Sequence, residues 1–228
     1  MKPGWTKMKN EKVMMASFPG LLLGFAAIFI LSGCNKETGP GPEIHDTKYL
    51  LIDSLGQAVE GMAGENDCVL DQFIGLTWEV KSDQPGLRDW RNTYSWYNPD
   101  ESFEGELDYR GVKNGGSCVG SDCDTTSYVK AVNAIAYCGH SDWRLPSRDE
   151  LGSISDPRKA DTPPTINVAV FPYTQPLEYW SGNDYQFQYD TAWRWSFEFG
   201  HDRVDWKAGP ALVRLVRGEV SLVPRVKE

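Results

Sequence analysis

The stretch that decides the fold is Cys138-Gly-His-Ser-Asp-Trp-Arg-Leu-Pro-Ser-Arg-Asp-Glu-Leu151. Gly139 is suited to a left-handed cap, so it predicts that a helix ends just before it, at Cys138. Trp143 and Leu145 alternate with polar residues, which predicts a short strand with one buried face. Pro146 then ends this strand, because proline has no N–H to donate to a neighbouring strand.

The second half of the stretch predicts the start of another helix. Ser147 and Glu150 have the spacing of a capping box, in which each side chain satisfies the other residue's backbone N–H. Leu151 and Ile154 give this helix an apolar side. The stretch is therefore a joint between helix, strand and helix, and its residue types indicate packing and capping rather than catalysis.

Six further motifs stand in order along the chain: Gly75-Leu-Thr-Trp-Glu79, Gly86-Leu-Arg-Asp-Trp90, Cys123-Asp-Thr-Thr-Ser-Tyr-Val129, Phe171-Pro172, Tyr179-Trp-Ser181 and Val213-Arg-Leu-Val-Arg-Gly218. Together with the joint, they resemble the signature of the Lcl C-terminal domain family, a bacterial family typified by the C-terminal domain of the Legionella collagen-like adhesin. The resemblance covers about Asp67 to Gly218. The residues of this fold signature are Trp78, Trp143, Arg144, Leu145, Pro146 and Trp180.

The fold class expected from these patterns is α+β: an irregular, loop-rich domain with short antiparallel strands and one or two helices. The segment Trp143-Arg-Leu-Pro-Ser147 is similar to an Arg-Leu-Pro-Thr segment of formylglycine-generating enzymes, and this similarity implies a C-type-lectin-like fold. The catalytic cysteine pair of those enzymes has no counterpart near the end of this chain. The similarity therefore does not imply their activity.

Alternating apolar residues predict strands on both sides of the joint. Before it, strands are expected at 49–52 and around Leu76, Trp78 and Val80, the latter half-buried. After it, Trp193 to Phe199 predicts a strand, a turn at 200–202 leads into 203–207, and 211–217 supplies a final strand. Between these groups, residues 82–120 predict a long aromatic loop anchored by its Trp and Tyr side chains.

A helix is also expected immediately before the joint. Asp124 is placed to cap its N-terminus. Tyr128, Val132 and Ile135 recur at helical spacing and predict its buried stripe.

The N-terminal 34 residues have the pattern of a lipoprotein signal peptide. Lysines precede an apolar run from Phe18 to Leu31, and Leu31-Ser-Gly-Cys34 resembles a lipobox, which implies lipidation at Cys34. The alternative is a single-pass anchor without lipidation. Asn35, rather than Asp, favours the outer membrane of a Gram-negative bacterium, with the domain facing the periplasm or the exterior.

The expected organisation is a signal peptide at 1–34, a flexible Gly/Pro-rich tether at 35–46, the Lcl-type domain at 47–218 and a tail at 219–228. The 228 residues carry a net charge of −9. Residues 1–34 contribute +3, so the remainder carries −12. Such an acidic chain does not favour nucleic acid as a partner.

Five cysteines occur at positions 34, 68, 118, 123 and 138. With Cys34 lipidated, the other four allow three disulfide connectivities. Their spacing does not match a structural zinc site, and export favours disulfides. We expect Cys118–Cys123 and Cys68–Cys138.

Enzyme motifs are missing from the sequence, which lacks the nucleophile elbow, the HExxH zinc motif, the P-loop and the dinucleotide glycine motif. No catalytic residue, metal or cofactor is therefore expected. The abundance of acidic residues keeps a carbohydrate-active hydrolase as an alternative, with Glu79, Asp89 and Glu104 as candidates only by residue type.

The expected function is ligand binding at the cell envelope, possible ligands being a glycan or a surface protein, with a role in adhesion. The family resemblance implies sulfated glycosaminoglycans, whereas the acidic charge favours a neutral glycan or a protein equally. The other alternative is a purely structural envelope protein. Candidate ligand-binding residues cluster late in the chain, where tryptophans offer stacking faces and cations offer a basic face: Trp193, Arg194, Trp195, Arg203, Lys207 and Arg214. The competing interpretations are core tryptophans and a salt-bridged sheet face.

Overall fold

The computed structural model describes residues 48–59, 67–101, 103–104 and 106–221. The expected signal peptide, its lipidation site Cys34 and the tether lie outside the described residues, as does the end of the tail. Within the described ranges, no helix is long and apolar enough to cross a membrane.

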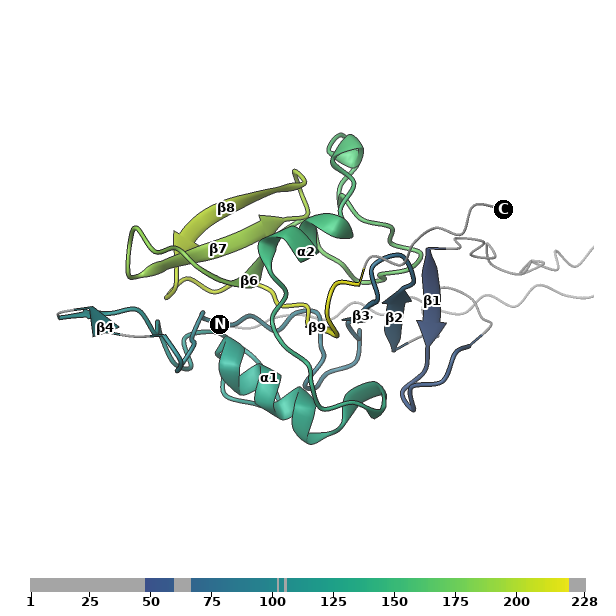
Figure 1. The fold of residues 1–228 in the computed structure, drawn as a ribbon, viewed down its shortest axis with the longest axis horizontal. Coiled ribbons are helices and arrows are strands. Elements are labelled where there is room, and N and C mark those ends of the chain that lie inside the picture. The colour runs from purple at the N-terminus through teal and green to yellow at the C-terminus, as the bar shows by residue number, and fades with distance from the viewer. Residues whose placement is uncertain (1–47, 60–66, 102, 105, 222–228) are drawn as a thin grey trace, which may run out of the picture. The chain divides into compact units, whose positions relative to one another are not determined.

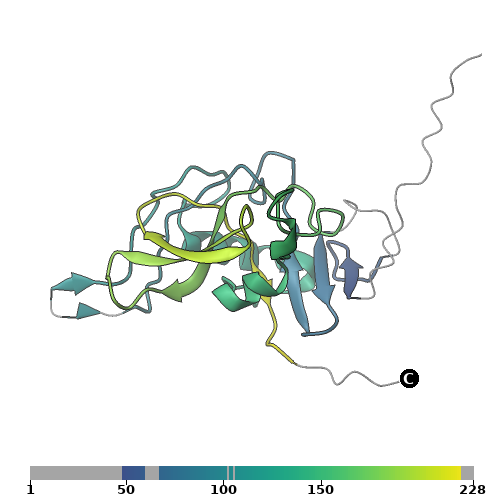
Figure 2. The same ribbon diagram turned by 90° about the horizontal axis from the view of Figure 1, so that it is seen from above.

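Two antiparallel sheets form the body of the domain, and a two-stranded hairpin extends from it (Figures 1 and 2). The first sheet has the order β1-β2-β3-β9, so the last strand of the chain pairs with the third. The second sheet has the order β6-β7-β8. In both views the hairpin of β4 and β5 lies at the end opposite β1. The strand bounds are β1 Tyr49–Ile52, β2 Cys68–Asp71, β3 Leu76–Glu79, β4 Phe103–Glu104, β5 Leu107–Asp108, β6 Glu178–Asp184, β7 Thr191–Ser196, β8 His201–Trp206 and β9 Val216–Arg217.

Short helices connect the strands. α2 packs against the second sheet, where Gly152 allows close approach, since a Cβ at this position would lie 3.0 Å from the ring of Trp195. The helices are α1 Thr125–Ala134, the 3₁₀ turn Tyr137–Gly139, α2 Arg148–Ser153 and the 3₁₀ turn Pro157–Lys159.

The first helix ends earlier than its sequence predicts. Asp124 caps α1 as expected, its side chain accepting from the N–H of Ser127 at 2.8 Å. The expected continuation to Cys138 is wrong, because Ala136 and Cys138 both take left-handed φ values, of 47° and 49°. Ile135 is therefore the C-cap rather than part of a buried stripe, and it is 59% exposed.

In the joint, the predicted capping box at Ser147 and Glu150 is confirmed, whereas the predicted strand around Trp143 and Leu145 is wrong. Ser147 Oγ accepts from the N–H of Glu150, and the Glu150 carboxylate accepts from the N–H of Ser147. The expected strand is a single bridge in which Arg144 pairs with Val216. The backbone N–H and carbonyl of Trp143 instead bond to the side chain of Asn133 on α1, at 2.8 and 2.9 Å, so they are not available to a strand ladder.

Two strands bury residues that alternation alone would expose. All four residues of β3 are buried, including Thr77 and Glu79. In β7, the expected apolar face is the less buried one: Trp193 and Trp195 are partly exposed, whereas Arg194 lies inside. The expected strand at 211–217 is reduced to β9 and isolated bridges.

The interior contains two apolar clusters, and β2 contributes to both, with Val69 in one and Cys68 in the other. One is built around Trp78, Leu151 and Phe197. The other includes Tyr94 and Trp96 from the long loop, both fully buried. The loop is therefore anchored by its aromatic residues, as predicted, and becomes part of the core.

Candidate functional site

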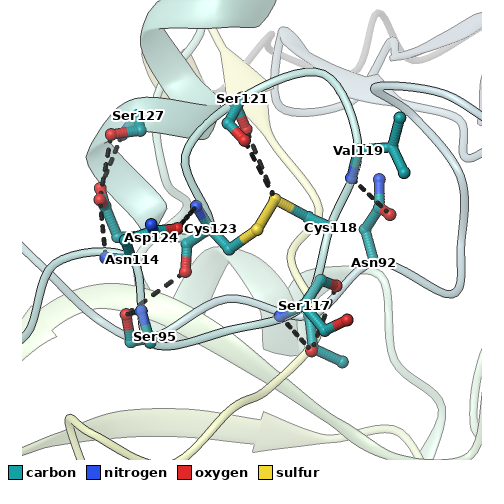
Figure 3. The surroundings of a disulfide bond; sticks show 12 residues. Asn92, Ser95, Asn114, Ser117, Cys118, Val119, Ser121, Cys123, Asp124 and Ser127 are labelled. Atoms are coloured by element: carbon teal, nitrogen blue, oxygen red, sulfur yellow. Dashed lines mark hydrogen bonds between the residues drawn. A yellow bond between two sulfur atoms is a disulfide. The ribbon is translucent and has the colours of Figure 1, made fainter.

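Both expected disulfides are present. Cys68–Cys138 joins β2 to the joint across 70 residues of sequence. Cys118–Cys123 closes a ring immediately before α1, where Cys123 N–H also donates to Asn114 Oδ1 at 2.7 Å (Figure 3). The ring therefore fixes the approach of the chain to the helix cap.

The tryptophans and the arginine of the fold signature serve the fold. Trp78, Trp143 and Trp180 are buried. Arg144 forms a two-point ion pair with Glu150, at 2.8 and 2.7 Å, which ties the joint to the first turn of α2.

A pocket of about 520 Å³ opens beside the joint. Arg144 and Leu145 form one side, and Thr126 and Val129 of α1 form the other. Since Arg144 is already paired with Glu150, this pocket lacks a free basic group from the signature.

Arg214, a predicted ligand-binding residue, lies in the interior. Its guanidinium donates to the carbonyl of Glu79 at 2.8 Å and to Thr174 Oγ1 at 2.7 Å. It also lies 4.9 Å from the ring centre of Phe171. Burial lowers the pKa of Arg214 from its usual value. The side chain stabilises the contact between β3 and the end of the chain and does not reach the surface.

Arg194 is also buried and paired. It binds Asp205 at 2.9 Å and Glu178 at 3.3 Å, and its guanidinium lies 3.9 Å from the ring centre of Trp180. Arg203 is exposed, but its guanidinium pairs with Glu178 at 2.6 Å. These cations therefore belong to a salt-bridged sheet face.

Lys207 connects three segments beneath the surface. Its Nζ donates to the carbonyls of Tyr109 and Tyr189, at 2.6 and 2.7 Å, and lies 2.5 Å from Asp184. It also lies 4.5 Å from the ring centre of Trp96. The structure thus brings none of the three buried cations, Arg194, Lys207 or Arg214, to a common exposed face.

Aromatic side chains, in contrast, gather at the surface of the second sheet. Tyr185 contacts both Phe187 and Trp193, with ring centres 5.4 Å apart in each case. Phe187 is 90% exposed and Trp206 is 55% exposed. Trp206 lies diagonally across from Trp193, because Trp193 pairs with Val204 two residues earlier in β8. We call this group the aromatic surface: Tyr185, Phe187, Tyr189, Trp193 and Trp206.

The predicted pair of tryptophans divides between two roles. Trp193 belongs to the aromatic surface, and the guanidinium of Arg148 lies 4.4 Å from its ring centre. Trp195 packs against the core and against Gly152 of α2.

The other members of the aromatic surface were missed at the level of sequence. For Tyr185, Phe187 and Tyr189, the signal was the run Tyr-Gln-Phe-Gln-Tyr at 185–189, in which aromatic and polar residues alternate. This run resembles a strand with one buried face, but it lies in the connection between β6 and β7 and remains at the surface.

Of the acidic candidates for hydrolysis, Glu79 and Asp89 have side chains that the structure describes, and both are buried and paired. The Glu79 carboxylate is buried and bonded to Lys81, Tyr128 and the N–H of Leu215. Asp89 pairs with Arg91 at 3.0 Å. The side chain of Glu104 lies outside the described residues. Among the described residues, no group of three or more His, Cys, Asp or Glu side chains could hold a metal ion.

The class of protein that these features define is a loop-rich α+β domain with two small antiparallel sheets, short helices and two disulfides. The model of the Lcl C-terminal domain family matches residues 67–217, which is more than half of the chain, and the protein belongs to this family. The expected family is therefore confirmed, as is the coarse fold class. No curated protein and no solved structure matches the chain, so the C-type-lectin-like assignment stays a prediction.

Proposed function

We propose that this protein is a non-catalytic lipoprotein of the cell envelope whose Lcl-type domain binds a glycan through its aromatic surface. The observation that carries the proposal is the exposure of Phe187 and Trp206 beside Tyr185 and Trp193. Exposed aromatic rings offer large, rigid apolar faces with polar groups at their edges, which suits the faces of sugar rings. A patch of this kind on a soluble domain indicates an interaction site.

The cations support a glycan with few anionic groups. Arg194, Lys207 and Arg214 are buried, and Arg203 is paired with Glu178. A sulfated chain needs exposed cations on one face, and these four residues do not supply it. The net charge of −12 beyond residue 34 disfavours polyanions further.

The anchoring part of the proposal rests on sequence. The apolar run before Leu31-Ser-Gly-Cys34 supports export and lipidation at Cys34, which would hold the domain at the outer membrane. Metabolic labelling with a palmitate analogue should label the wild-type protein, whereas Cys34→Ala should remove the label. Equal labelling of both would exclude lipidation at this cysteine.

A glycan array tests the binding function. It should include neutral, sialylated and sulfated glycans and be read with calcium and with chelator. Binding that falls at least tenfold in a Phe187→Ala/Tyr185→Ala variant, with an unchanged unfolding curve, would support the proposal. If no glycan binds and a protein partner does, the aromatic surface is a protein interface instead. Release of reducing ends from any glycan during incubation would contradict the non-catalytic part of the proposal.

A further inference from the structure

A pocket of about 280 Å³ lies where the β6–β7 connection meets the end of β8. Two partly exposed aromatic side chains of the aromatic surface, Tyr189 and Trp206, line it together with Val112. We infer that this pocket is a subsite for a single neutral pyranose unit of a glycan. The inference rests on the proposed function and names the class of sugar and the residues that bind it.

Lys207 lines the pocket and is held in place by neighbours from three segments of the chain. This side chain is 1% exposed and links the carbonyls of Tyr109 and Tyr189 to the carboxylate of Asp184. Gly111 packs directly against it, since a Cβ at Gly111 would lie 3.2 Å from Cδ of Lys207 and 2.4 Å from the Trp96 carbonyl oxygen. The pocket is therefore formed before a ligand arrives, which lowers the entropic cost of binding.

The walls are suited to the apolar face of a sugar ring. Tyr189 is 39% exposed and Trp206 is 55% exposed, so both rings have free surface. Tyr189 is supported from behind by Tyr109, with ring centres 6.3 Å apart. Apolar walls with a few convergent polar groups are typical of small-molecule sites.

The polar groups of the pocket are hydrogen-bond acceptors. Asp190 lines the pocket, and its Oδ1 is buried with no hydrogen-bond partner among the residues that the structure describes. A buried carboxylate oxygen without a partner is costly, so a rotation of the Asp190 side chain that brings this oxygen to a ligand hydroxyl would be favourable. Asp108 lines the same pocket, and the side chain and backbone of Arg110 lower its pKa to about 2. Asp108 is therefore an ionised acceptor at any physiological pH.

The charges of the pocket select against anionic sugars. Asp108 and Asp190 line it, and the two cations beside them are already paired, Arg110 with Asp108 at 2.9 Å and Lys207 with Asp184. A sulfate or a sugar carboxylate placed here would meet the carboxylate of Asp190, and both neighbouring cations are engaged by Asp108 and Asp184. Neutral hydroxyls, which can donate to both carboxylates, fit this set.

The test uses the full-length protein in detergent on an array of neutral, sialylated and sulfated oligosaccharides. We expect binding to neutral pyranosides that changes less than about twofold between roughly 50 and 500 mM NaCl, because no ion pair is involved. Trp206→Ala should weaken this binding at least tenfold because it removes an aromatic wall of the pocket. Asp190→Asn should also weaken it at least tenfold, the effect of losing one hydrogen bond to a charged group. Phe199→Ala is the matched control: Phe199 is 50% exposed but lies at the other end of the hairpin, next to His201.

The outcomes separate this inference from the proposed function. If binding to neutral glycans survives both Trp206→Ala and Asp190→Asn, the pocket is not the sugar-binding site, although the protein still binds glycans. Salt-sensitive binding to sulfated chains alone would also contradict a neutral-sugar subsite in this pocket, while glycan binding would remain the function. Binding to no glycan overturns both. If Trp206→Ala changes the circular dichroism spectrum, Asp190→Asn decides, because it preserves the shape of the side chain and removes only its charge.

Discussion

The carboxylate of Glu79 joins three parts of the interior. One oxygen accepts from Lys81 Nζ at 3.0 Å and from the hydroxyl of Tyr128 on α1. The other accepts from the N–H of Leu215 at 2.9 Å. Burial lowers the pKa of Lys81 and raises that of Tyr128 well above its usual value, so Tyr128 is a neutral donor. Glu79 thus links β3 to α1 and to the segment that contains Leu215.

Replacing Glu79 by Gln should destabilise the fold by about 3–5 kcal/mol, because Lys81 would remain buried without its counter-charge. Guanidinium chloride unfolding, followed by tryptophan fluorescence, measures the change. Asp122→Asn is the control: this carboxylate is exposed, and its loss should change stability by less than about 0.5 kcal/mol. Equal unfolding midpoints for the two variants would contradict the role of Glu79.

At the scale of the element, α2 depends on its capping box more than on its length. The helix has only six residues, too few to be stable by helix propensity alone. Ser147 and Glu150 satisfy each other's backbone N–H groups, and Glu150 also binds Arg144. Burial opposes ionisation of Glu150, but the hydrogen bonds from Arg144 and Ser147 prevail and lower its pKa.

Ser147→Ala should cost about 1 kcal/mol of stability, because it leaves the N–H of Glu150 without an acceptor. Thermal unfolding measures the loss, and Ser147→Thr should retain most of the stability, since threonine offers the same oxygen. A Ser147→Ala variant as stable as Ser147→Thr would show that the cap does not hold α2.

The position at which α1 ends could not be predicted from the sequence. Asp124 and the stripe of Tyr128 and Val132 were predicted correctly, because capping and helical spacing are local properties. The apolar Ile135 continued the spacing and predicted a longer helix. The chain instead leaves the helix there, because Cys138 must reach Cys68 of β2, and this constraint is not local.

At the scale of the molecule, the two disulfides close loops of very different length. Cys68–Cys138 spans 70 residues and connects the first sheet to the joint, whereas Cys118–Cys123 spans five. In the chain-entropy model, a cross-link stabilises more when the loop that it closes is longer.

Replacing Cys68 and Cys138 by Ala should therefore lower stability by about 4 kcal/mol, against about 2 kcal/mol for the pair Cys118 and Cys123. Chemical denaturation of the two double variants under non-reducing conditions compares them, with the wild type in reductant as a reference. A larger loss from the short ring would mean that its local geometry at the α1 cap outweighs chain entropy.

Stability should also fall in acid. Arg110 lowers the pKa of Asp108 to about 2, from 3.8, and Arg217 lowers that of Asp142. Because each folded-state pKa lies below the unfolded value, both groups stabilise the fold above about pH 4, and this contribution is lost as the pH falls toward 2.

The Tm should therefore decrease between about pH 5 and pH 2.5, the range over which such carboxyl groups are protonated. In Asp142→Asn, the decrease should be less steep, since one of the titrating groups is absent. Differential scanning calorimetry at low salt measures both curves. A Tm that rises or stays constant over this range would contradict the assignment.

The aromatic surface illustrates why the site was only partly predictable. Trp193 was identified because it stands in a clear alternating strand. Arg194 and Lys207 were expected at the surface from their charge, yet Asp205 and Asp184 neutralise them inside. Sequence does not indicate which carboxylate will meet a given cation across a sheet.

The sequence alone predicted the family, the capping box and the positions of several strands along the chain, because motifs, caps and alternation depend on residue types at short spacing. It left three disulfide connectivities open, and the structure contains the one that was expected. Tertiary structure alone decided which faces are buried. β3 is covered on both sides, so Glu79 became an interior group, and β7 presents Trp193 outward while Arg194 lies inside. Burial depends on what packs against a strand from elsewhere in the chain, and alternation within the strand does not contain that information.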